Sequence, residues 1–231
     1  MTAVKTTRAE KALRTRQRML DSARELIVGQ GYAATTMEQI AAGAGVALQT
    51  IYYTFHTKGR LLCELMEAVA AGTDRPPPVM ERPWVAEMMA TDSAHRALAL
   101  AVEHGTDIFA RAAPLWIAIR AASATDHAVA AYWDGVGRDR REGMGRLAIR
   151  FAELGSLRPG LDTRRAGDLI FALQSHDLYS TLVEQAGWPL ADFKGWLYGT
   201  LSDQLLAGGP AGDPLHGLSF GVGSVAARDD A

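Results

Sequence analysis

Apolar side chains recur every three to four residues along most of the chain, which is the spacing of helices that bury one face. The first such stripe consists of Leu13, Leu20, Ala23 and Ile27. Gly31 follows it, and a glycine suits the left-handed conformation that often ends a helix. The pattern therefore predicts a first helix that begins near Leu13 and ends before Gly31.

Two capping signals predict where the second helix begins. Thr35 and Thr36 are each followed three residues later by a Glu or Gln, the combination that caps the free amides of a helix start. The residues leave the choice between these two registers open. Residues 43–45, Gly-Ala-Gly, end this short helix, and a third helix is expected over about 47–53.

Thr57 is expected to cap a fourth helix, which ends at Gly72 because the Arg-Pro-Pro-Pro run at 75–78 cannot continue a helix. We place the domain boundary at this run. Beyond it, the spacing predicts helices over 81–91, 93–111, 114–124, 126–154, 162–186 and 190–206. Pro114 and Pro189 suit first helical turns. No segment alternates apolar and polar residues between hairpin turns, so the predicted class is all-α.

The composition agrees with a folded helical protein, and the basic and acidic residues are unevenly distributed along the chain. The 231 residues are 48% hydrophobic, and the formal net charge of −2 taken whole argues against a nucleic-acid binder. Residues 1–58, however, hold eight basic and four acidic side chains, which leaves 16 of the 24 basic and 22 of the 26 acidic ones for the rest. The basic head either meets a polyanion or only solubilises the N-terminus.

Residues 35–58 read TTMEQIAAGAGVALQTIYYTFHTK and contain the informative motif. Two short helices joined by a glycine turn must cross at close range. Ala41, Gly45 and Ile51 supply a small residue at the crossing, a turn residue that tolerates positive φ, and an apolar anchor in the second helix. This is the packing of a helix-turn-helix, whose second helix lies in the DNA major groove.

The outer side of the third helix has side chains suited to base edges and phosphates, while Ile51 and Phe55 are expected to point inward. The outer set is Leu48, Gln49, Thr50, Tyr52 and Tyr53. Lys58 adds a cation at the next helix start, which suits a phosphate. The alternative is that these side chains only cover a surface helix hairpin.

The sequence resembles the TetR (tetracycline repressor-like) family of bacterial transcription regulators over roughly residues 12–72. The matching positions are Thr36, Ile40-Ala41, Gly45-Val46, Thr50-Ile51-Tyr52, Phe55, Lys58 and Leu61-Leu62. Thr54 stands where the family generally has His or Tyr, and Gly59 where it usually has a charged residue. Beyond Gly72 the similarity is only architectural.

The resemblance implies the domain organisation. An N-terminal three-helix helix-turn-helix DNA-binding domain would span 12–72, with its motif at about 36–55, and a basic arm at 1–11 would precede it. A C-terminal helical ligand-binding and dimerisation domain would span 76–207. Residues 208–231, rich in Gly and Ala, are expected to form a mobile tail.

The resemblance also implies roles for single residues. Leu48, Gln49 and Tyr52 would lie at the base edges. The phosphates would be held by Thr36, Thr50, Tyr53 and Lys58. Contacts to the minor groove or the backbone would come from Lys5, Arg8, Lys11 and Arg14, ahead of the first helix. The expected partner is a near-palindromic double-stranded operator, because a symmetric dimer places its recognition helices one DNA turn apart.

The C-terminal body offers aromatic residues that either line an effector pocket or belong to ordinary core. The pocket candidates are Phe109, Trp116, Trp133 and His176. The helices at 162–186 and 190–206 are expected to form the homodimer interface by the family resemblance, and the alternative is that their apolar positions all face the domain's own core.

Other chemistry is not indicated. The chain has no phosphate-binding glycine loop, no nucleophile elbow and no HExxH pattern, so no catalytic residue, metal or cofactor is expected. Cys63 is expected to be a buried, inert thiol. The N-terminus has no apolar signal segment and no stretch could span a membrane, so we expect a cytoplasmic location.

The sequence thus predicts a homodimeric, ligand-responsive repressor, released from DNA by a small apolar or aromatic effector. An activator of the same family is one alternative. A ligand-binding protein or an enzyme with a degenerate head, which no longer binds DNA, is the other.

Overall fold

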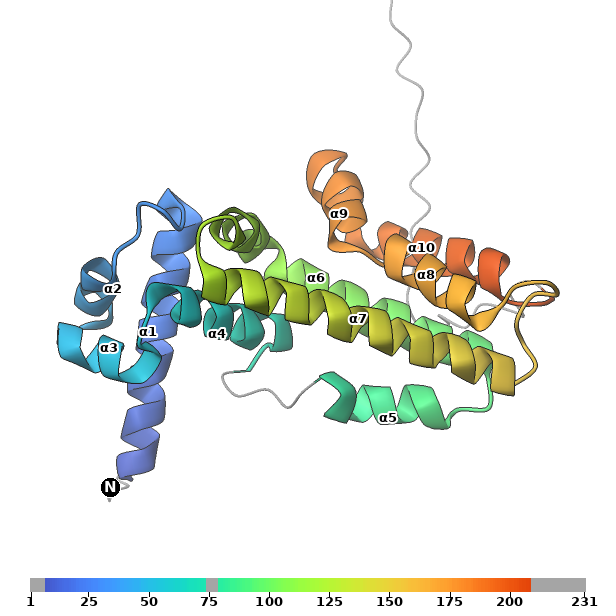
Figure 1. Cartoon of the computed structure of the whole chain (residues 1–231), viewed down its shortest axis with the longest axis horizontal. Helices are drawn as coiled ribbons and strands as arrows, with labels where there is room; N and C mark the ends of the chain where they lie inside the picture. The colour runs from blue at the N-terminus through green and yellow to red at the C-terminus, as the bar shows by residue number, and fades with distance from the viewer. Residues whose placement is uncertain (1–6, 74–78, 209–231) are drawn as a thin grey trace, which may run out of the picture. The chain divides into compact units, whose positions relative to one another are not determined.

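The structure is a computed structural model that describes residues 7–73 and 79–208, and over those ranges it is helical apart from turns and one isolated bridge between Leu157 and Leu206 (Figure 1). The predicted all-α class is confirmed. The chain divides into two compact units, one of residues 1–77 with 110–139 and the other of 78–109 with 140–231.

The first unit contains four N-terminal helices and parts of two long ones. These are α1 (Arg8–Gln30), α2 (Met37–Ala44), α3 (Leu48–Phe55), α4 (Lys58–Ala71), the second half of α6 (Ala94–Ser123) and the first half of α7 (His127–Glu153). Leu115 and Ile119 of α6 and Val129 of α7 are buried in the same apolar cluster as the N-terminal helices. A single break at the proline run therefore does not separate the units, because residues from beyond it complete the core of the first.

The first helix begins earlier than the apolar stripe predicts. Thr7 Oγ1 accepts a hydrogen bond from the Glu10 amide at 3.2 Å, and the Glu10 carboxylate accepts one from the Thr7 amide at 2.8 Å, which closes a capping box before Arg8. The expectation of an arm that precedes the first helix is therefore wrong for Arg8, Lys11 and Arg14, which lie on α1. Lys5 lies outside the described residues.

The capping of α2 and α4 follows the sequence closely. Of the two registers left open, the structure has the later one, with Thr36 before α2 and Gln39 closing the capping box. Thr57 accepts from the Arg60 amide at the start of α4, and Gly72 ends that helix with φ of 72°. The third helix runs two residues further than predicted, to Phe55.

The second unit contains the remaining elements. They are the 3-10 turn η1 (Val79–Glu81), α5 (Pro83–Ala90), α8 (Thr163–Leu173), α9 (His176–Tyr179), the π-helical segment η2 (Ser180–Gln185) and α10 (Leu190–Leu205), together with the first half of α6 and the second half of α7. Lys194 links α10 to α6, because the Lys194 Nζ donates to Glu103 Oε1 and to Asp107 Oδ1, both at 2.7 Å.

Beyond the proline run, the predicted division into helices is wrong in two places. Pro114 lies inside α6 and does not start a new helix. A proline has no amide to donate to the carbonyl of Ala110, which normally favours a break. Here the neighbouring Ala112 and Leu115 are almost fully buried, so packing keeps the helix continuous.

The second error concerns 162–186, where the spacing predicts one long helix and the structure has α8, α9 and η2 in succession. Gln174 leaves the helical conformation, with ψ of 64°, and its buried side-chain amide donates to the Ala101 carbonyl of α6 at 2.5 Å. Arg140 of α7 then donates to the carbonyls of Phe171 and Gln174 at 3.1 and 2.8 Å, which satisfies groups that the break exposes. Hydrophobic periodicity carries no information about these long-range polar contacts.

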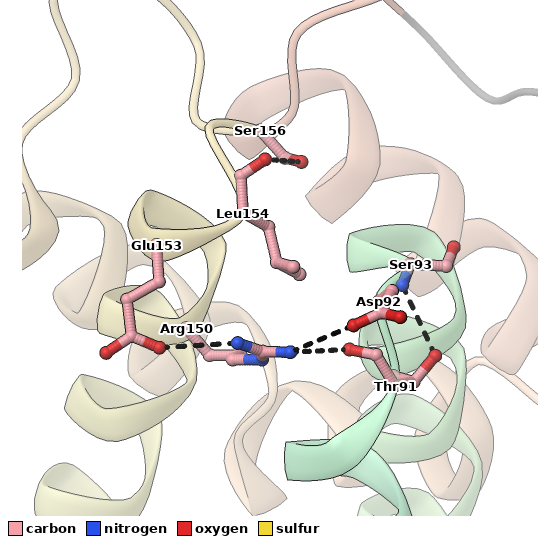
Figure 2. A network of polar contacts seen from close by, with 7 residues as sticks. All are labelled: Thr91, Asp92, Ser93, Arg150, Glu153, Leu154 and Ser156. Carbon is pink, nitrogen blue, oxygen red and sulfur yellow. Dashed lines mark hydrogen bonds and ion pairs between the residues drawn. The ribbon is translucent and has the colours of Figure 1, made fainter.

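The turn between α5 and α6 is held by an arginine of α7 within the second unit (Figure 2). Arg150 Nη2 donates to the Thr91 carbonyl at 3.0 Å and lies 3.6 Å from Asp92 Oδ1, while its Nη1 lies 3.5 Å from Glu153. Ser93 donates its amide to Thr91 Oγ1 in the same turn. The polar network thus fixes where α6 begins.

The predicted tail at 208–231 lies outside the described residues, apart from position 208. Among the residues that are described, no helix has both the length and the apolar composition that a membrane crossing requires.

Candidate nucleic-acid interface

The hairpin of α2 and α3 has the close crossing that the motif predicts. Ala41 and Ile51 are buried, and Gly45 between the helices adopts the left-handed conformation, with φ 64° and ψ 42°. The Val46 amide donates to the Ala41 carbonyl at 3.0 Å, which closes the turn. The hairpin is therefore a rigid helix-turn-helix, with the glycine where an L side chain would be strained.

A contact that the sequence reasoning missed holds α2 against α1. The buried Ser22 hydroxyl donates to the Ile40 carbonyl at 3.0 Å. A Cβ on Gly43 would lie 3.4 Å from the Ser22 Cβ and closer still to its hydroxyl, so Gly43 is also needed for the approach of the two helices. A serine among the apolar positions of α1, beside Met19 and Ala23, is the signal that could have revealed this contact.

The two faces of α3 are sharply different. Ile51 and Phe55 are fully buried, whereas Tyr53 is 86% exposed and Tyr52 is 42% exposed. Gln49 is exposed as well. An aromatic side chain left in water has no packing role in its own unit, so the possibility that Tyr53 points inward is excluded.

The other residues expected at DNA lie beside this face. Leu48 and Thr50 are half-buried on α3, and Thr36 is exposed at the start of α2. The Thr36 hydroxyl already accepts from the Gln39 amide at 3.3 Å, which uses a lone pair and leaves the hydroxyl hydrogen to be donated. The structure thus brings these side chains to one helix pair, and their contacts with DNA stay a prediction.

Lys58 has internal partners that the sequence did not predict. Its Nζ donates to the carbonyls of Tyr32 and Thr35 at 2.9 and 2.8 Å and lies 4.2 Å from the centre of the Tyr32 ring. The ammonium therefore holds the loop between α1 and α2 against α4. With two of its three donors used internally, a phosphate contact at Lys58 stays a prediction for the third donor and the helix amides.

The basic charge of the head is also partly used inside the protein. Arg16 Nη1 pairs with Glu64 at 2.8 Å, and its guanidinium lies 4.9 Å from the centre of the Phe55 ring. Arg60 Nε pairs with the same Glu64 at 3.0 Å. Only part of the positive charge counted from the sequence is thus available to a polyanion.

Cys63 shows no sign of reactivity. Burial, followed by the charge of Asp126, raises the pKa of the Cys63 thiol to about 12. A thiolate is the reactive form, so this thiol is inert at neutral pH. Within the described ranges, 7–73 and 79–208, no three His, Cys, Asp or Glu side chains gather in a way that could hold a metal ion.

The four effector candidates fall into two pairs, one in each unit. Phe109 and His176 meet edge to face with ring centres 6.0 Å apart, and Trp116 and Trp133 meet at 4.7 Å. Tyr179, which the sequence reasoning did not select, lies near both members of the first pair.

A hollow of about 300 Å³ in the first unit lies away from these aromatic pairs, between α1, α4 and α6. Its lining includes Leu20, Arg24, Val69 and Arg111, and none of the four candidates.

The all-helical fold and this hairpin define a helix-turn-helix transcription regulator. Residues 19–65 match the family described as bacterial regulatory proteins, tetR family. The chain belongs to this TetR family. The matched range contains the whole hairpin and Lys58, so the family resemblance of the head is confirmed.

Two named relatives are similar to part of the chain. HTH-type transcriptional regulator SrpR of Pseudomonas putida is 37% identical over 95 residues, which are 38% of this chain and 43% of SrpR. The uncharacterized HTH-type transcriptional regulator TtgW, also of Pseudomonas putida, is likewise 37% identical over 95 residues, with 38% of this chain and 68% of TtgW covered. The match thus spans less than half of SrpR.

Solved structures extend the likeness of fold to most of the chain. NalD of Pseudomonas aeruginosa has a TM-score of 0.67 at 21% identity, and the match covers 85% of this chain and 99% of NalD. SmeT in complex with triclosan has a TM-score of 0.66 at 23% identity, with 84% and 93% covered. The likeness of fold therefore extends well beyond the DNA-binding head.

Proposed function

We propose that this TetR-family regulator is a homodimeric repressor that binds a near-palindromic operator through α3 and is released by a small apolar or aromatic effector. The observation that carries the proposal is the division of α3 into a fully buried face and an exposed face with Gln49, Tyr52 and Tyr53. A helix seated firmly on one side and rich in hydrogen-bonding side chains on the other is suited to the major groove.

In this proposal the residues divide into two groups. Leu48, Gln49 and Tyr52 read base edges, and the phosphate contacts come from Thr36, Thr50, Tyr53 and Lys58. Arg8, Lys11 and Arg14 contact the DNA backbone as side chains of the first turns of α1, in place of the extended arm that the sequence predicts. The protein acts in the cytoplasm, and we assign it no catalytic chemistry.

Repression and release by an effector are supported by what related proteins are described as doing. NalD is described as the secondary repressor of a multidrug efflux pump, and SmeT of Stenotrophomonas maltophilia as the repressor of another. SmeT has also been solved with triclosan, a small aromatic compound. The candidates for the effector site are the two aromatic pairs, Phe109 with His176 and Trp116 with Trp133. The segments 162–186 and 190–206 are the proposed dimer interface, where Trp196 is 37% exposed.

The test is selection of duplexes from a random pool by the purified chain, followed by affinity measurements. We expect enrichment of a near-palindrome with half-sites about one DNA turn apart. Gln49→Ala should then relax one position of each half-site by about 1–3 kcal/mol if its contact is bidentate. Gln17→Ala is the matched control, since Gln17 is a glutamine of α1 outside the hairpin. An unaltered profile for Gln49→Ala would exclude its role as a base reader.

Two further outcomes separate the alternatives. Failure to enrich any duplex would favour a ligand-binding protein or an enzyme with a degenerate head. A mass in solution equal to one chain at micromolar concentration would contradict the dimer. Reporter expression from the selected operator distinguishes repression from activation, because the two change transcription in opposite directions.

A further inference from the structure

Gly59, one of the two positions of the head that depart from the family pattern, has a close neighbour in the structure. The side chain of Asp126, from the turn between α6 and α7, lies against Gly59 in the first turn of α4. A Cβ on Gly59 would lie 2.7 Å from the carboxylate carbon of Asp126 and closer still to one of its oxygens. Only glycine leaves room for this carboxylate, and both residues belong to the first unit.

The carboxylate of Asp126 is fixed from two other directions. Its Oδ1 accepts from the amides of Ala128 and Val129 at 2.9 and 3.3 Å and so caps α7. Its Oδ2 accepts from the Tyr32 hydroxyl at 3.0 Å. Because the α7 amides and the Tyr32 hydroxyl both hold the same carboxylate, it cannot move aside cheaply to accommodate a larger residue at position 59.

Tyr32 connects this carboxylate to the DNA-binding hairpin. It lies in the loop that leads from α1 into α2, and its ring and its carbonyl both contact the Lys58 ammonium of α4. Burial, and then the hydrogen bond to Asp126, raise the pKa of Tyr32, so its hydroxyl stays protonated and donating at neutral pH. The start of α4 and the approach to α2 are thus tied to one side chain of the α6–α7 turn.

We propose that Asp126 is a positioning residue for DNA binding: seated against Gly59 and bonded to Tyr32, it fixes where the helix-turn-helix hairpin lies relative to α4. The inference rests on the proposed DNA-binding function and adds how the DNA-reading hairpin is held in place. In this proposal the contact between Asp126 and Gly59 acts by placing the hairpin and not by reading a base. Its effect is on specific binding, because base readout requires α3 to be held in one orientation, while loose phosphate contact does not.

A double-mutant cycle tests the contact. Asp126→Ser keeps a capping hydroxyl for α7 but is too short to reach Tyr32 or to fill the space beside Gly59. Gly59→Ala places a methyl group where the carboxylate lies. We expect each single variant to lose about tenfold in affinity for the duplex that the wild-type chain selects, and the double variant to lose no more than Asp126→Ser alone.

Two controls separate positioning from general damage. Gly137→Ala adds a methyl group to α7 in open space and should leave the affinity unchanged. Asp126→Asn keeps the size and the Oδ1 cap of α7, and its amide nitrogen can donate to the Tyr32 hydroxyl oxygen, so it should retain most of the affinity that Asp126→Ser loses. Affinity for a scrambled duplex should change little in every variant, which a merely unfolded head would not show.

The proposal is overturned if the losses in affinity from Gly59→Ala and Asp126→Ser are additive, if Asp126→Asn and Asp126→Ser are equally damaging, or if selected and scrambled duplexes lose affinity equally. Hydrogen exchange of the α2 and α3 amides in DNA-free protein gives a second readout. Exchange of these amides should be faster in Tyr32→Phe and Asp126→Ser and unchanged in Gly137→Ala. If exchange in Tyr32→Phe and Asp126→Ser equals that of the wild type, the positioning proposal is also overturned. Failure of the DNA-binding proposal is recognised separately, because the wild-type chain would then select no duplex.

Discussion

The turn glycine of the hairpin gives a prediction whose sign depends on backbone conformation alone. Gly45 is in the left-handed region, and a Cβ placed there would meet nothing closer than an Arg18 guanidinium nitrogen at 3.6 Å, an ordinary contact. Gly137 lies within α7, and a Cβ there would meet nothing within 4 Å. Both belong to the first unit, and neither substitution by alanine creates a clash.

The expected changes in the free energy of unfolding are opposite in sign. Gly45→Ala should lower it by about 1–2 kcal/mol, the cost of a left-handed L residue. Gly137→Ala should raise it by about 0.5–1 kcal/mol, because glycine is a poor helix former. The two variants therefore differ by about 1.5–3 kcal/mol. At a urea slope of about 3 kcal/mol/M, this separates their midpoints by about 0.5–1 M.

Urea unfolding followed by far-ultraviolet circular dichroism measures this difference. The slopes should stay equal, since neither change alters the surface exposed on unfolding. Gly45→Asn should fall between Gly45→Ala and the wild type, because asparagine tolerates the left-handed region better than alanine does. Equal midpoints for Gly45→Ala and Gly137→Ala would refute the reasoning that the hairpin turn requires positive φ.

Two further predictions concern titratable groups. Burial lowers the pKa of Lys194, but its bonds to Asp107 and Glu103 outweigh this and raise it overall, so its contribution to stability is complete below about pH 10.4 and is lost as pH rises through the higher folded-state pKa. Lys194→Met should thus lower the unfolding free energy by about 1–3 kcal/mol at pH 7 and by less at strongly alkaline pH; a gap in urea midpoint that stays constant with pH would contradict the assignment. With its pKa raised to about 12 by burial, Cys63 should resist iodoacetamide at pH 8 in the native protein and react in urea, and rapid native alkylation would show that the thiol is accessible.

The parts of the fold that local signals determine were predictable from the sequence. Thr36 with Gln39 and Gly45 mark the hairpin through capping and turn chemistry, and the apolar stripes identify the helices that follow. The resemblance to the TetR family depends on the same residues, so the fold class and the family could both be predicted from them. The exposed face of α3 followed from the inward placement of Ile51 and Phe55, since the remaining positions had to face outward.

The parts that depend on distant contacts were not predictable. The break at Gln174 exists because a carbonyl of α6 accepts its amide and Arg140 caps the exposed end of α8, partners that lie far away in sequence. Pro114 sits in a continuous helix because tertiary packing outweighs its local preference. Gly59 stands out in the sequence only as a departure from the family, and its reason, the carboxylate of Asp126, is visible only once the α6–α7 turn is placed beside α4.

The two long helices shared between the units have a consequence for modularity. Leu115, Ile119 and Val129 complete the core of the DNA-binding unit, although they lie well beyond the proline run in sequence. A fragment cut at that run would expose the apolar face that these residues cover, and it would tend to aggregate. The DNA-binding head therefore cannot be transferred between proteins as one contiguous segment. A transferred head that is to fold must include the α6–α7 turn. Substitutions in the head and in that turn must therefore remain compatible with each other.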